Sequence, residues 1–159
     1  MKLNLKFTFA AVIFACSLVG CGLFTRTTYD TAAYKAIHEA ASNGDTNAIN
    51  RLLLAHPDLV NAQDYDKNTP LHLAAIGNFP ETIELLLSKG GNVNAQNAVK
   101  MTPLHLAAKS GYAEAVKSLL KATPKLDLID ERDFTPLTWA EKTHHDEVAA
   151  LLRQAGAKD

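Results

Sequence analysis

A seven-residue segment, Thr-Pro-Leu-His-Leu-Ala-Ala, occurs twice in this chain and constrains its fold more than any other feature. It occupies residues 69–75 and, 33 residues later, residues 102–108. A degenerate copy, Thr-Pro-Leu-Thr-Trp-Ala-Glu, follows at the same spacing at residues 135–141. Upstream, residues 37–41 keep the histidine and the paired alanines, with one extra residue that we expect in the loop around residues 56–57. This fixed period predicts a repeat protein, in which neighbouring units stack to bury a common core.

The repeated segment predicts a short helix. Thr69 can cap the helix N-terminus with its hydroxyl group, and Pro70 suits the first helical position, where a backbone N–H would be unpaired in any case. Leu71, Ala74 and Ala75 then form one apolar stripe, and the small alanines allow a neighbouring helix to approach closely. The residues expected to end these helices tolerate a left-handed turn, and they are Gly44, Asn78 and Gly111.

A second apolar pattern follows each turn and predicts a second helix in every repeat. Each copy has Ile or Val followed by leucines three and four residues later, beginning at Ile49, Ile83, Val116 and Val148. An extended stretch, clearest at residues 92–97, then leads to the next copy. Each repeat is therefore predicted to run as helix, turn, helix and extended loop.

Together these features resemble the ankyrin repeat. The period, the seven-residue word, the Gly or Asn turn, the Leu-Leu helix and the Asn-Ala-Gln-Asp entry to a hairpin all agree with that family. The resemblance covers residues 34–158 and divides them into four repeats, at approximately 34–66, 67–99, 100–132 and 133–158. It implies an all-α solenoid of four helix-turn-helix repeats with short β-hairpin loops.

Two departures from the family pattern lead to further expectations. At the hairpin tips, where the family usually has glycine, this chain has Lys67, Lys100 and Asp133. If these positions require a positive φ, a residue other than glycine costs about 1–2 kcal/mol. In the last repeat, Glu141 and Arg153 interrupt the apolar pattern, and we expect them to give the outer face of that repeat to water.

The first twenty residues are organised as a signal peptide. Two lysines give a positive start, and residues 7–19 form an apolar segment too short to span a bilayer as an ordinary helix. Leu-Val-Gly-Cys at residues 18–21 resembles the lipobox of bacterial lipoprotein signal peptides. The resemblance implies cleavage of residues 1–20, acylation of Cys21 with chains such as palmitate, and a lipidated tether over residues 21–33. An ordinary signal sequence with an incidental cysteine, or an uncleaved anchor, remains the alternative.

The residue after this cysteine bears on localisation. By resemblance to the sorting of Gram-negative lipoproteins, Gly22 favours the outer membrane, with the repeat domain facing the periplasm. Because Cys16 would leave with the signal peptide and Cys21 would carry lipid, no thiol would remain for disulfide, redox or Cys-metal chemistry.

Charge and motifs argue against several classes of function. The chain has 16 basic and 17 acidic side chains and no basic patch, which disfavours nucleic-acid binding. No phosphate-binding glycine loop, nucleophile motif or His-Glu-x-x-His zinc motif is present, so the sequence predicts no catalytic residue, cofactor or small-molecule substrate. Asp130 and Glu131 are expected to be exposed hairpin residues rather than a pair for acid-base chemistry.

Three histidines, His38, His72 and His105, share one repeat position, and their spacing argues against metal binding. Equivalent helices of neighbouring repeats lie about 8–10 Å apart. Zinc ligands lie about 2 Å from the ion, so these imidazoles cannot converge on one metal. We expect them to bond to backbone groups between repeats instead.

The remaining surface is the candidate site. In ankyrin arrays, as the resemblance implies, partner proteins bind a concave face made by the hairpin tips and the exposed side of the first helices. Tyr, Trp and Arg are frequent energetic centres of such interfaces. The partner-binding residues predicted here are Tyr65, Asp66, Lys67, Asn68, Val99, Lys100, Met101, Arg132, Asp133, Phe134 and Trp139, with Ile76, Lys109 and Lys142 beside them on the helices. Met101, Phe134 and Trp139 could instead pack against their own repeats.

The sequence therefore predicts a membrane-tethered protein-interaction module of the bacterial cell envelope that binds another protein as an adaptor or scaffold. The alternative is an immunity protein that neutralises a periplasmic toxin by direct binding. An enzymatic function has no candidate residues.

Overall fold

The computed structural model describes residues 31–158 of the 159-residue chain. Within this range it contains eight α-helices and one 3-10 helix, and no residue is assigned to a strand. The elements are α1 (Thr31–Ser42), α2 (Thr46–Ala55), η1 (Pro57–Asn61), α3 (Pro70–Ile76), α4 (Pro80–Ser88), α5 (Pro103–Ser110), α6 (Ala113–Leu120), α7 (Pro136–Lys142) and α8 (Asp146–Gln154). The predicted signal peptide and Cys21 lie outside the described residues, and α1 begins before residue 34, the predicted start of the domain.

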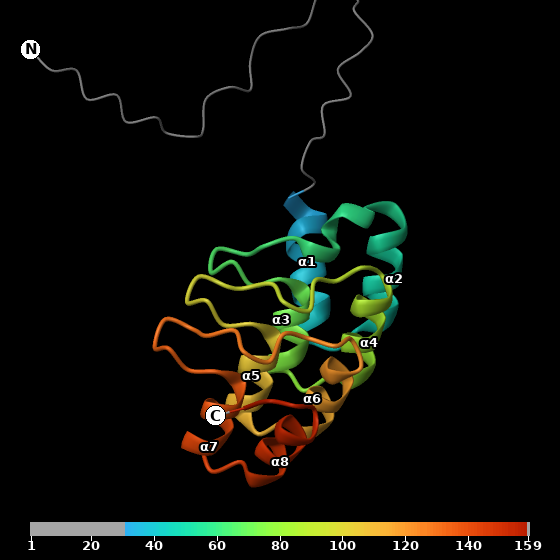
Figure 1. The fold of residues 1–159 in the computed structure, drawn as a ribbon. Coiled ribbons are helices and arrows are strands. Elements are labelled where there is room, and N and C mark those ends of the chain that lie inside the picture. The colour runs from blue at the N-terminus through green and yellow to red at the C-terminus, as the bar shows by residue number, and fades with distance from the viewer. Residues whose placement is uncertain (1–30, 159) are drawn as a thin grey trace, which may run out of the picture.

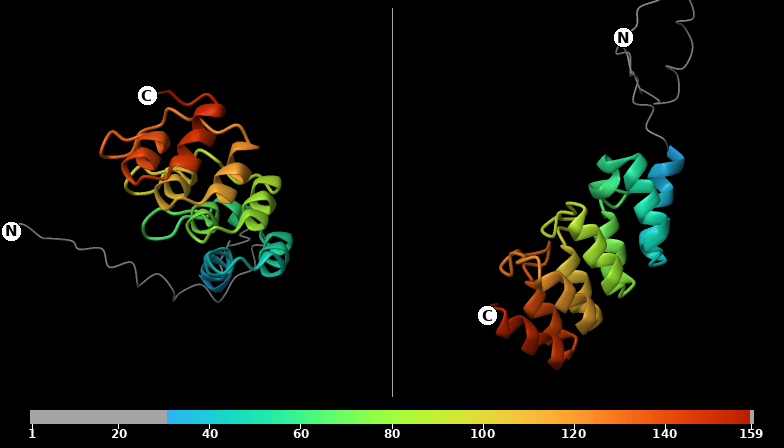
Figure 2. Two further views of the ribbon diagram at one scale, coloured as in Figure 1. Left: turned by 90° about the horizontal axis from the view of Figure 1, so that it is seen from below. Right: turned by 90° about the vertical axis from the view of Figure 1, so that its right-hand side faces the viewer.

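The helices stack in two layers. Figures 1 and 2 show α1, α3, α5 and α7 following one another along one layer and α2, α4, α6 and α8 along the other. Successive helices contact each other within each layer, and the two helices of each repeat also pack together. The loops that join successive repeats project from the side of the first layer (Figure 1). The predicted solenoid of four helix-turn-helix units is thus confirmed, although its loops are tight turns without assigned strands.

The Thr-Pro segment starts α3, α5 and α7 as expected, and in α3 and α5 the histidine of the same segment completes the cap. In α5, the backbone N–H of His105 donates to Oγ1 of Thr102 at 3.3 Å. In return, the backbone N–H of Thr102 donates to Nδ1 of His105 at 3.1 Å. These reciprocal bonds satisfy donors that a helix start leaves unpaired. Leu104, Ala107 and Ala108 then lie fully buried along the predicted apolar stripe.

The turns inside the repeats adopt the predicted left-handed conformation. Gly44, Asn78 and Gly111 have φ values of 71°, 55° and 73°. His144 occupies the equivalent turn of the last repeat with φ 60°, although its residue type does not predict this conformation. At Gly111 the requirement is twofold, because a Cβ atom there would also lie 2.5 Å from Nδ1 of His145. The His145 ring thus closes over the turn of the preceding repeat, as the Phe79 ring does over Gly44.

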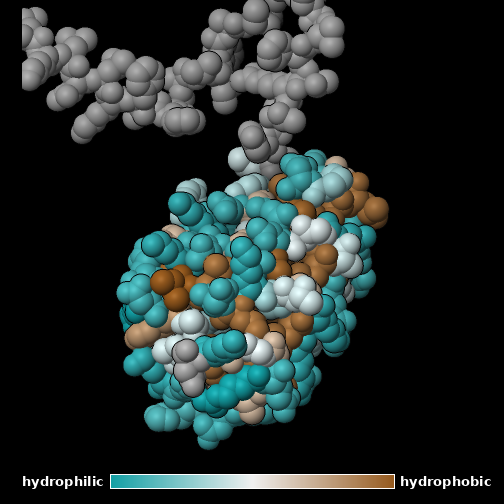
Figure 3. Space-filling view, viewed as in Figure 1, coloured by the Kyte–Doolittle hydropathy of each residue, from teal (hydrophilic) through white to brown (hydrophobic). Residues whose placement is uncertain are grey.

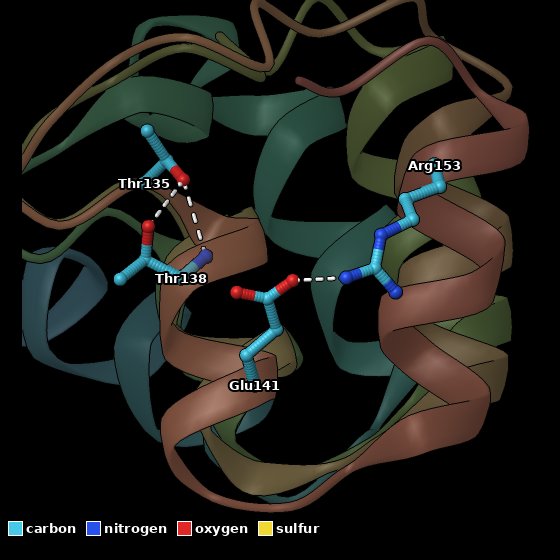
Figure 4. Close-up of polar contacts among 4 residues, drawn as sticks. All are labelled: Thr135, Thr138, Glu141 and Arg153. Carbon is cyan, nitrogen blue, oxygen red and sulfur yellow. Dashed lines mark hydrogen bonds and ion pairs between the residues drawn. The ribbon is translucent and has the colours of Figure 1, made fainter. Parts of the chain in front are cut away.

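The last repeat differs from the others on its outer face. Within residues 31–158, no further repeat packs on that face. Glu141 holds the position that Ala108 occupies one repeat earlier, but its side chain is exposed and pairs with Arg153 (Figure 4). Thr138 replaces the repeated histidine and bonds to Thr135, with 3.0 Å between their Oγ1 atoms. The prediction that Glu141 and Arg153 give this face to water is confirmed.

Candidate protein-binding surface

Three five-residue loops form the tips of the predicted concave face. They cover residues 64–68, 97–101 and 130–134, and in each the first backbone N–H donates to the fifth carbonyl oxygen at 2.9 to 3.1 Å. The first residue is Asp or Asn, and its side-chain oxygen accepts the backbone N–H groups of the third and fifth residues. This pattern fixes the shape of each tip. The sequence shows an Asp or Asn at this repeat position, as Asp64, Asn97 and Asp130, but its bonds to the loop backbone were not predicted.

The fourth residue of each loop has a positive φ. The φ values of Lys67, Lys100 and Asp133 are 58°, 58° and 59°. The condition stated from the sequence is therefore met: these positions have a positive φ although none of them is glycine. This backbone conformation costs a residue other than glycine about 1–2 kcal/mol. The loop hydrogen bonds described above hold the backbone in it.

The loops also bond to one another and form a continuous row. The N–H of Ala98 donates to the carbonyl of Asp66 at 2.8 Å, and the N–H of Glu131 donates to the carbonyl of Val99 at 3.2 Å. Because each tip is held by the next one, their side chains project from a backbone with few alternative conformations.

The repeated histidines connect the row of loops to the helices, because each ring in α3 and α5 bonds to the next loop. Nε2 of His72 lies 3.0 Å from the carbonyl oxygen of Met101, and Nε2 of His105 lies 3.1 Å from that of Phe134. Since Nδ1 of each ring accepts a backbone N–H, the neutral ring carries its proton on Nε2 and donates to the next loop. Burial lowers the pKa of His72 to about 4 and also lowers the pKa of His105. The expected bonding between repeats is confirmed.

His38, in the first repeat, differs from the other two rings. Its Nε2 lies 3.1 Å from the carbonyl of Ala62, but its Nδ1 lies 2.8 Å from the carbonyl of Tyr34 instead of a backbone N–H. Without Thr-Pro, α1 begins at Thr31, so the equivalent backbone N–H, that of Lys35, lies inside the helix. A neutral His38 ring can donate to one of these carbonyls at a time.

Most predicted partner-binding side chains are accessible. Tyr65 at the first tip is fully exposed, and Val99 at the second tip retains 45% of its surface. Ile76, at the end of α3, retains 44%. The charged tip residues are also exposed, whereas Asn68 and Phe134 are half-buried; the exposed ones are Asp66, Lys67, Lys100, Arg132 and Asp133.

Two residues predicted to contact a partner, Met101 and Trp139, are buried. Their prediction as direct contact residues is therefore wrong. Met101 is 7% exposed and Trp139 is 6% exposed. The indole N–H of Trp139 donates to Oδ2 of Asp130 at 2.7 Å, and its ring meets that of Phe134 edge to face at 5.4 Å. Tertiary packing therefore makes Trp139 a supporting residue of the concave face.

Asp130 is the second correction, because it is 3% exposed rather than solvated. Burial raises the pKa of its carboxyl group. Hydrogen bonds from the Trp139 indole and from the backbone N–H groups of Phe134 and Arg132 outweigh that effect and lower the pKa overall. The ionised carboxylate is thus an internal support that joins the third tip to α7.

Three cations surround the aromatic pair of the last repeat. Nζ of Lys109 lies 4.4 Å from the centre of the Trp139 ring, and the guanidinium carbon of Arg132 lies 5.6 Å from it. Nζ of Lys142 lies 4.7 Å from the centre of the Phe134 ring. We call Lys109, Arg132 and Lys142 the cation cluster. Lys109 and Arg132 also line a depression of about 320 Å³ together with Val99, Met101, Asp130 and Glu131.

Among residues 31–158, no group of three or more His, Cys, Asp or Glu side chains is placed to hold a metal ion. None of the helices within residues 31–158 has the length and apolar character needed to cross a membrane.

The fold and this row of loops define a helical repeat solenoid of the kind that binds other proteins. A family model described as "Ankyrin repeats (3 copies)" matches residues 13–97 and 78–159, and the chain belongs to the ankyrin-repeat family. Ankyrin repeats are protein-interaction modules, and the family is typically non-enzymatic. A relative from Caenorhabditis elegans, a "Transient receptor potential cation channel subfamily A member 1 homolog", is 52% identical over 44 residues. That match covers 27% of this chain and only 4% of the channel homologue.

Proposed function

We propose that this chain is a protein-binding module tethered at the bacterial cell envelope, where it holds a partner protein on its concave face as an adaptor or scaffold. The observation that carries the proposal is Tyr65, a fully exposed aromatic side chain on a loop whose backbone is fixed by internal hydrogen bonds. Large aromatic side chains on rigid supports bind with little loss of conformational freedom.

Neighbouring residues extend this contact surface. Val99 lies on the next tip, and its carbonyl group is bonded to the third tip. Ile76 holds in α3 the repeat position that Lys109, which lines the depression, holds in α5. Exposed apolar groups surrounded by charged side chains are typical of protein interfaces. Figure 3 shows apolar patches among polar surface on the side that bears the loops.

Site-specific photo-crosslinking in the native cells tests this surface. We expect a photoreactive amino acid at position 65 or 99 to give an adduct of defined mass. The same amino acid at position 54 should give none, because Leu54 is 78% exposed but lies on α2, in the other helix layer. Adding Tyr65→Ala should lower the yield from position 99 about tenfold or more, since a central aromatic contributes on the order of 2 kcal/mol, whereas Leu54→Ala should leave it unchanged.

An adduct from position 54 without one from positions 65 and 99 would place the interface on the other layer and refute the proposal. Mass spectrometry of the adduct also separates two uses of the same surface. A resident envelope protein would identify an adaptor or scaffold. A toxin-like protein would identify an immunity protein, which binds through the same face.

The tether is the second part of the proposal. The lipobox resemblance at residues 18–21 supports cleavage before Cys21 and acylation of that residue. A chain of a dozen extended residues reaches about 40 Å. A lipid on Cys21 would therefore hold the repeats close to their membrane, which we propose is the outer membrane, on its periplasmic side.

Substitution of Cys21 by alanine is expected to release the protein from the membrane fraction without changing its folding. Lipid attachment is lost, whereas the buried core that the structure describes is built from residues between Ala33 and Leu152. Fractionation of cell envelopes, with incorporation of a labelled fatty acid as a second readout, checks this outcome. Cys16→Ala is the matched control and should remain in the membrane fraction. A Cys21→Ala protein that still pellets with membranes would show that the anchor is not this lipid.

A further inference from the structure

The cation cluster differs from three basic groups in or next to the helices of the layer that α2, α4, α6 and α8 form, which we call the outer layer. On the outer layer, Lys117 pairs with Glu114 and Glu147, and Lys121 pairs with Glu84. Arg153 likewise pairs with Glu141. These carboxylates occupy the positions at which an external acidic group would bind.

By contrast, no carboxylate oxygen of residues 31–158 lies within 4 Å of the charged nitrogens of Lys109, Arg132 or Lys142. Aromatic rings hold these three cations instead. The nearest buried acid, Asp130, is already occupied by the Trp139 indole and two backbone N–H groups. A ring orients a cation without neutralising it, so the cluster keeps its full charge for an incoming anion.

Two features favour carboxylates of a protein over a phosphate polymer. Glu131 and Asp133 flank Arg132 at the third tip and are exposed, so they repel a densely charged chain. The whole protein carries a formal net charge of −1 and has no long-range attraction for polyanions. Val99 lies in the same depression as Lys109 and Arg132 and is 45% exposed, which adds an apolar contact beside the charges.

We propose that the cation cluster is a specificity subsite for an acidic segment of the partner protein, in which Asp or Glu side chains lie next to apolar ones. Carboxylates bind Lys109, Arg132 and Lys142, and the apolar neighbours pack against Val99. Trp139 acts as a positioning residue because it holds two of the cations without being exposed itself. This inference rests on the proposed function, since it names the kind of partner that the concave face takes.

Selection from a phage-displayed library of random linear peptides tests the subsite without knowledge of the partner. The bait is the full chain, immobilised in detergent. We expect enriched peptides to contain Asp or Glu next to apolar residues, and replacing those acids by amides should weaken binding about thirtyfold. The triple variant Lys109→Gln, Arg132→Gln, Lys142→Gln should show the same loss.

The matched control removes three positive charges from the outer layer, in Lys117→Gln, Lys121→Gln, Arg153→Gln, and should bind the peptide within about threefold of wild type. Thermal unfolding of both triple variants checks that each is folded. If both triple variants lost peptide binding equally, the loss would be an effect of net charge, and the subsite proposal would be wrong. Enrichment of no peptide, or of peptides without acids, would also overturn it. So would tighter binding of an oligonucleotide or of anionic vesicles than of the peptide.

Trp139→Leu separates positioning from charge. Leucine occupies the equivalent position in the two preceding repeats, at Leu73 and Leu106, so the repeat accommodates this side chain, and all three cations remain. We expect the peptide to bind about two- to fivefold more weakly, because the rings that hold the cations contribute a modest amount each. Unchanged binding would show that Trp139 is structural only.

Crosslinking keeps this inference distinct from the function on which it rests. If the adduct from position 99 persists in the Lys109, Arg132 and Lys142 triple variant, the concave face binds a partner but the acidic-segment inference is wrong. If the wild-type protein gives no adduct from positions 65 and 99, the proposed function itself fails.

Discussion

Truncation of Leu86 to alanine is expected to lower the free energy of unfolding by about 2–5 kcal/mol, because it leaves a cavity that the surrounding helices only partly fill. Leu86 lies in α4 and is fully buried. Its helix packs on α3 within its own repeat and on α2 and α6 in the neighbouring ones. The cavity would therefore loosen contacts on both sides of the second repeat.

The size of this loss matters because single domains are stable by only about 5–15 kcal/mol. In a repeat stack, stability is approximately the sum of each repeat and its interfaces with its neighbours. A weakened interface at α4 should thus lower the melting temperature and broaden the transition. Thermal unfolding followed by circular dichroism measures the melting temperature and the breadth of the transition, and urea unfolding measures the loss of free energy.

Leu54→Ala is the matched control, since Leu54 is also a helical leucine but is 78% exposed. Its effect should remain within about 0.5 kcal/mol, as for ordinary surface substitutions. A Leu86→Ala protein with the melting temperature of the wild type would contradict the stacking of α4 on its neighbours.

The fold could be predicted because its signals are local and repeated. The Thr-Pro start, the alanine pair and the Gly or Asn turn each act within a few residues, and they recur at one period. The sequence left the φ of Lys67, Lys100 and Asp133 open, because these residue types do not require the left-handed conformation that the loops in fact adopt. The left-handed conformation of His144 was not predicted, because histidine does not require it as glycine often does; the turn closes through the bond from the N–H of His145 to the carbonyl of Ala140.

The surface was predicted less completely, because exposure depends on residues that are distant in sequence. Tyr65 and Val99 are exposed as expected of tip residues, whereas the bond between Trp139 and Asp130 buries both side chains. The contacts of the cation cluster could not be predicted from local sequence patterns either. Lys109 belongs to one repeat and Trp139 to the next, and only the stacking of α5 on α7 brings them together. Which of these residues a partner contacts remains a prediction.

Acidification is expected to destabilise the protein over a defined range, because His72 is buried in its neutral form. Burial lowers its pKa from 6.5 to about 4, although the carbonyl of Met101 and the charge of Asp64 oppose this shift. Between these two values the unfolded chain binds more protons than the folded one. The stability that neutral His72 contributes is therefore fully present above pH 6.5 and is lost as the pH falls towards 4. Below pH 4, His72 causes no further change in stability. The difference of about 2.5 pKa units corresponds to about 3 kcal/mol.

The hydrogen bonds of the ring explain why protonation is costly. Nδ1 of His72 accepts the backbone N–H of Thr69 at 3.1 Å, and a protonated Nδ1 cannot accept it. The cap of α3 would then lose a bond, and Thr69 would retain an unpaired buried N–H, a costly arrangement. Since Nε2 bonds to Met101, any movement of the ring would also release the second loop from α3.

His72→Asn provides the test, because asparagine has both a donor and an acceptor but does not titrate. Urea unfolding of both proteins between pH 4 and pH 7 should show a smaller change in stability for the variant, by about 3 kcal/mol, whatever its stability at neutral pH. The double variant with His105→Asn should be flatter still, since burial lowers the pKa of that ring as well. Equal pH dependence in wild type and His72→Asn would mean that His72 accepts a proton in the folded protein as readily as in the unfolded chain. The pH dependence of stability would then come from groups other than His72.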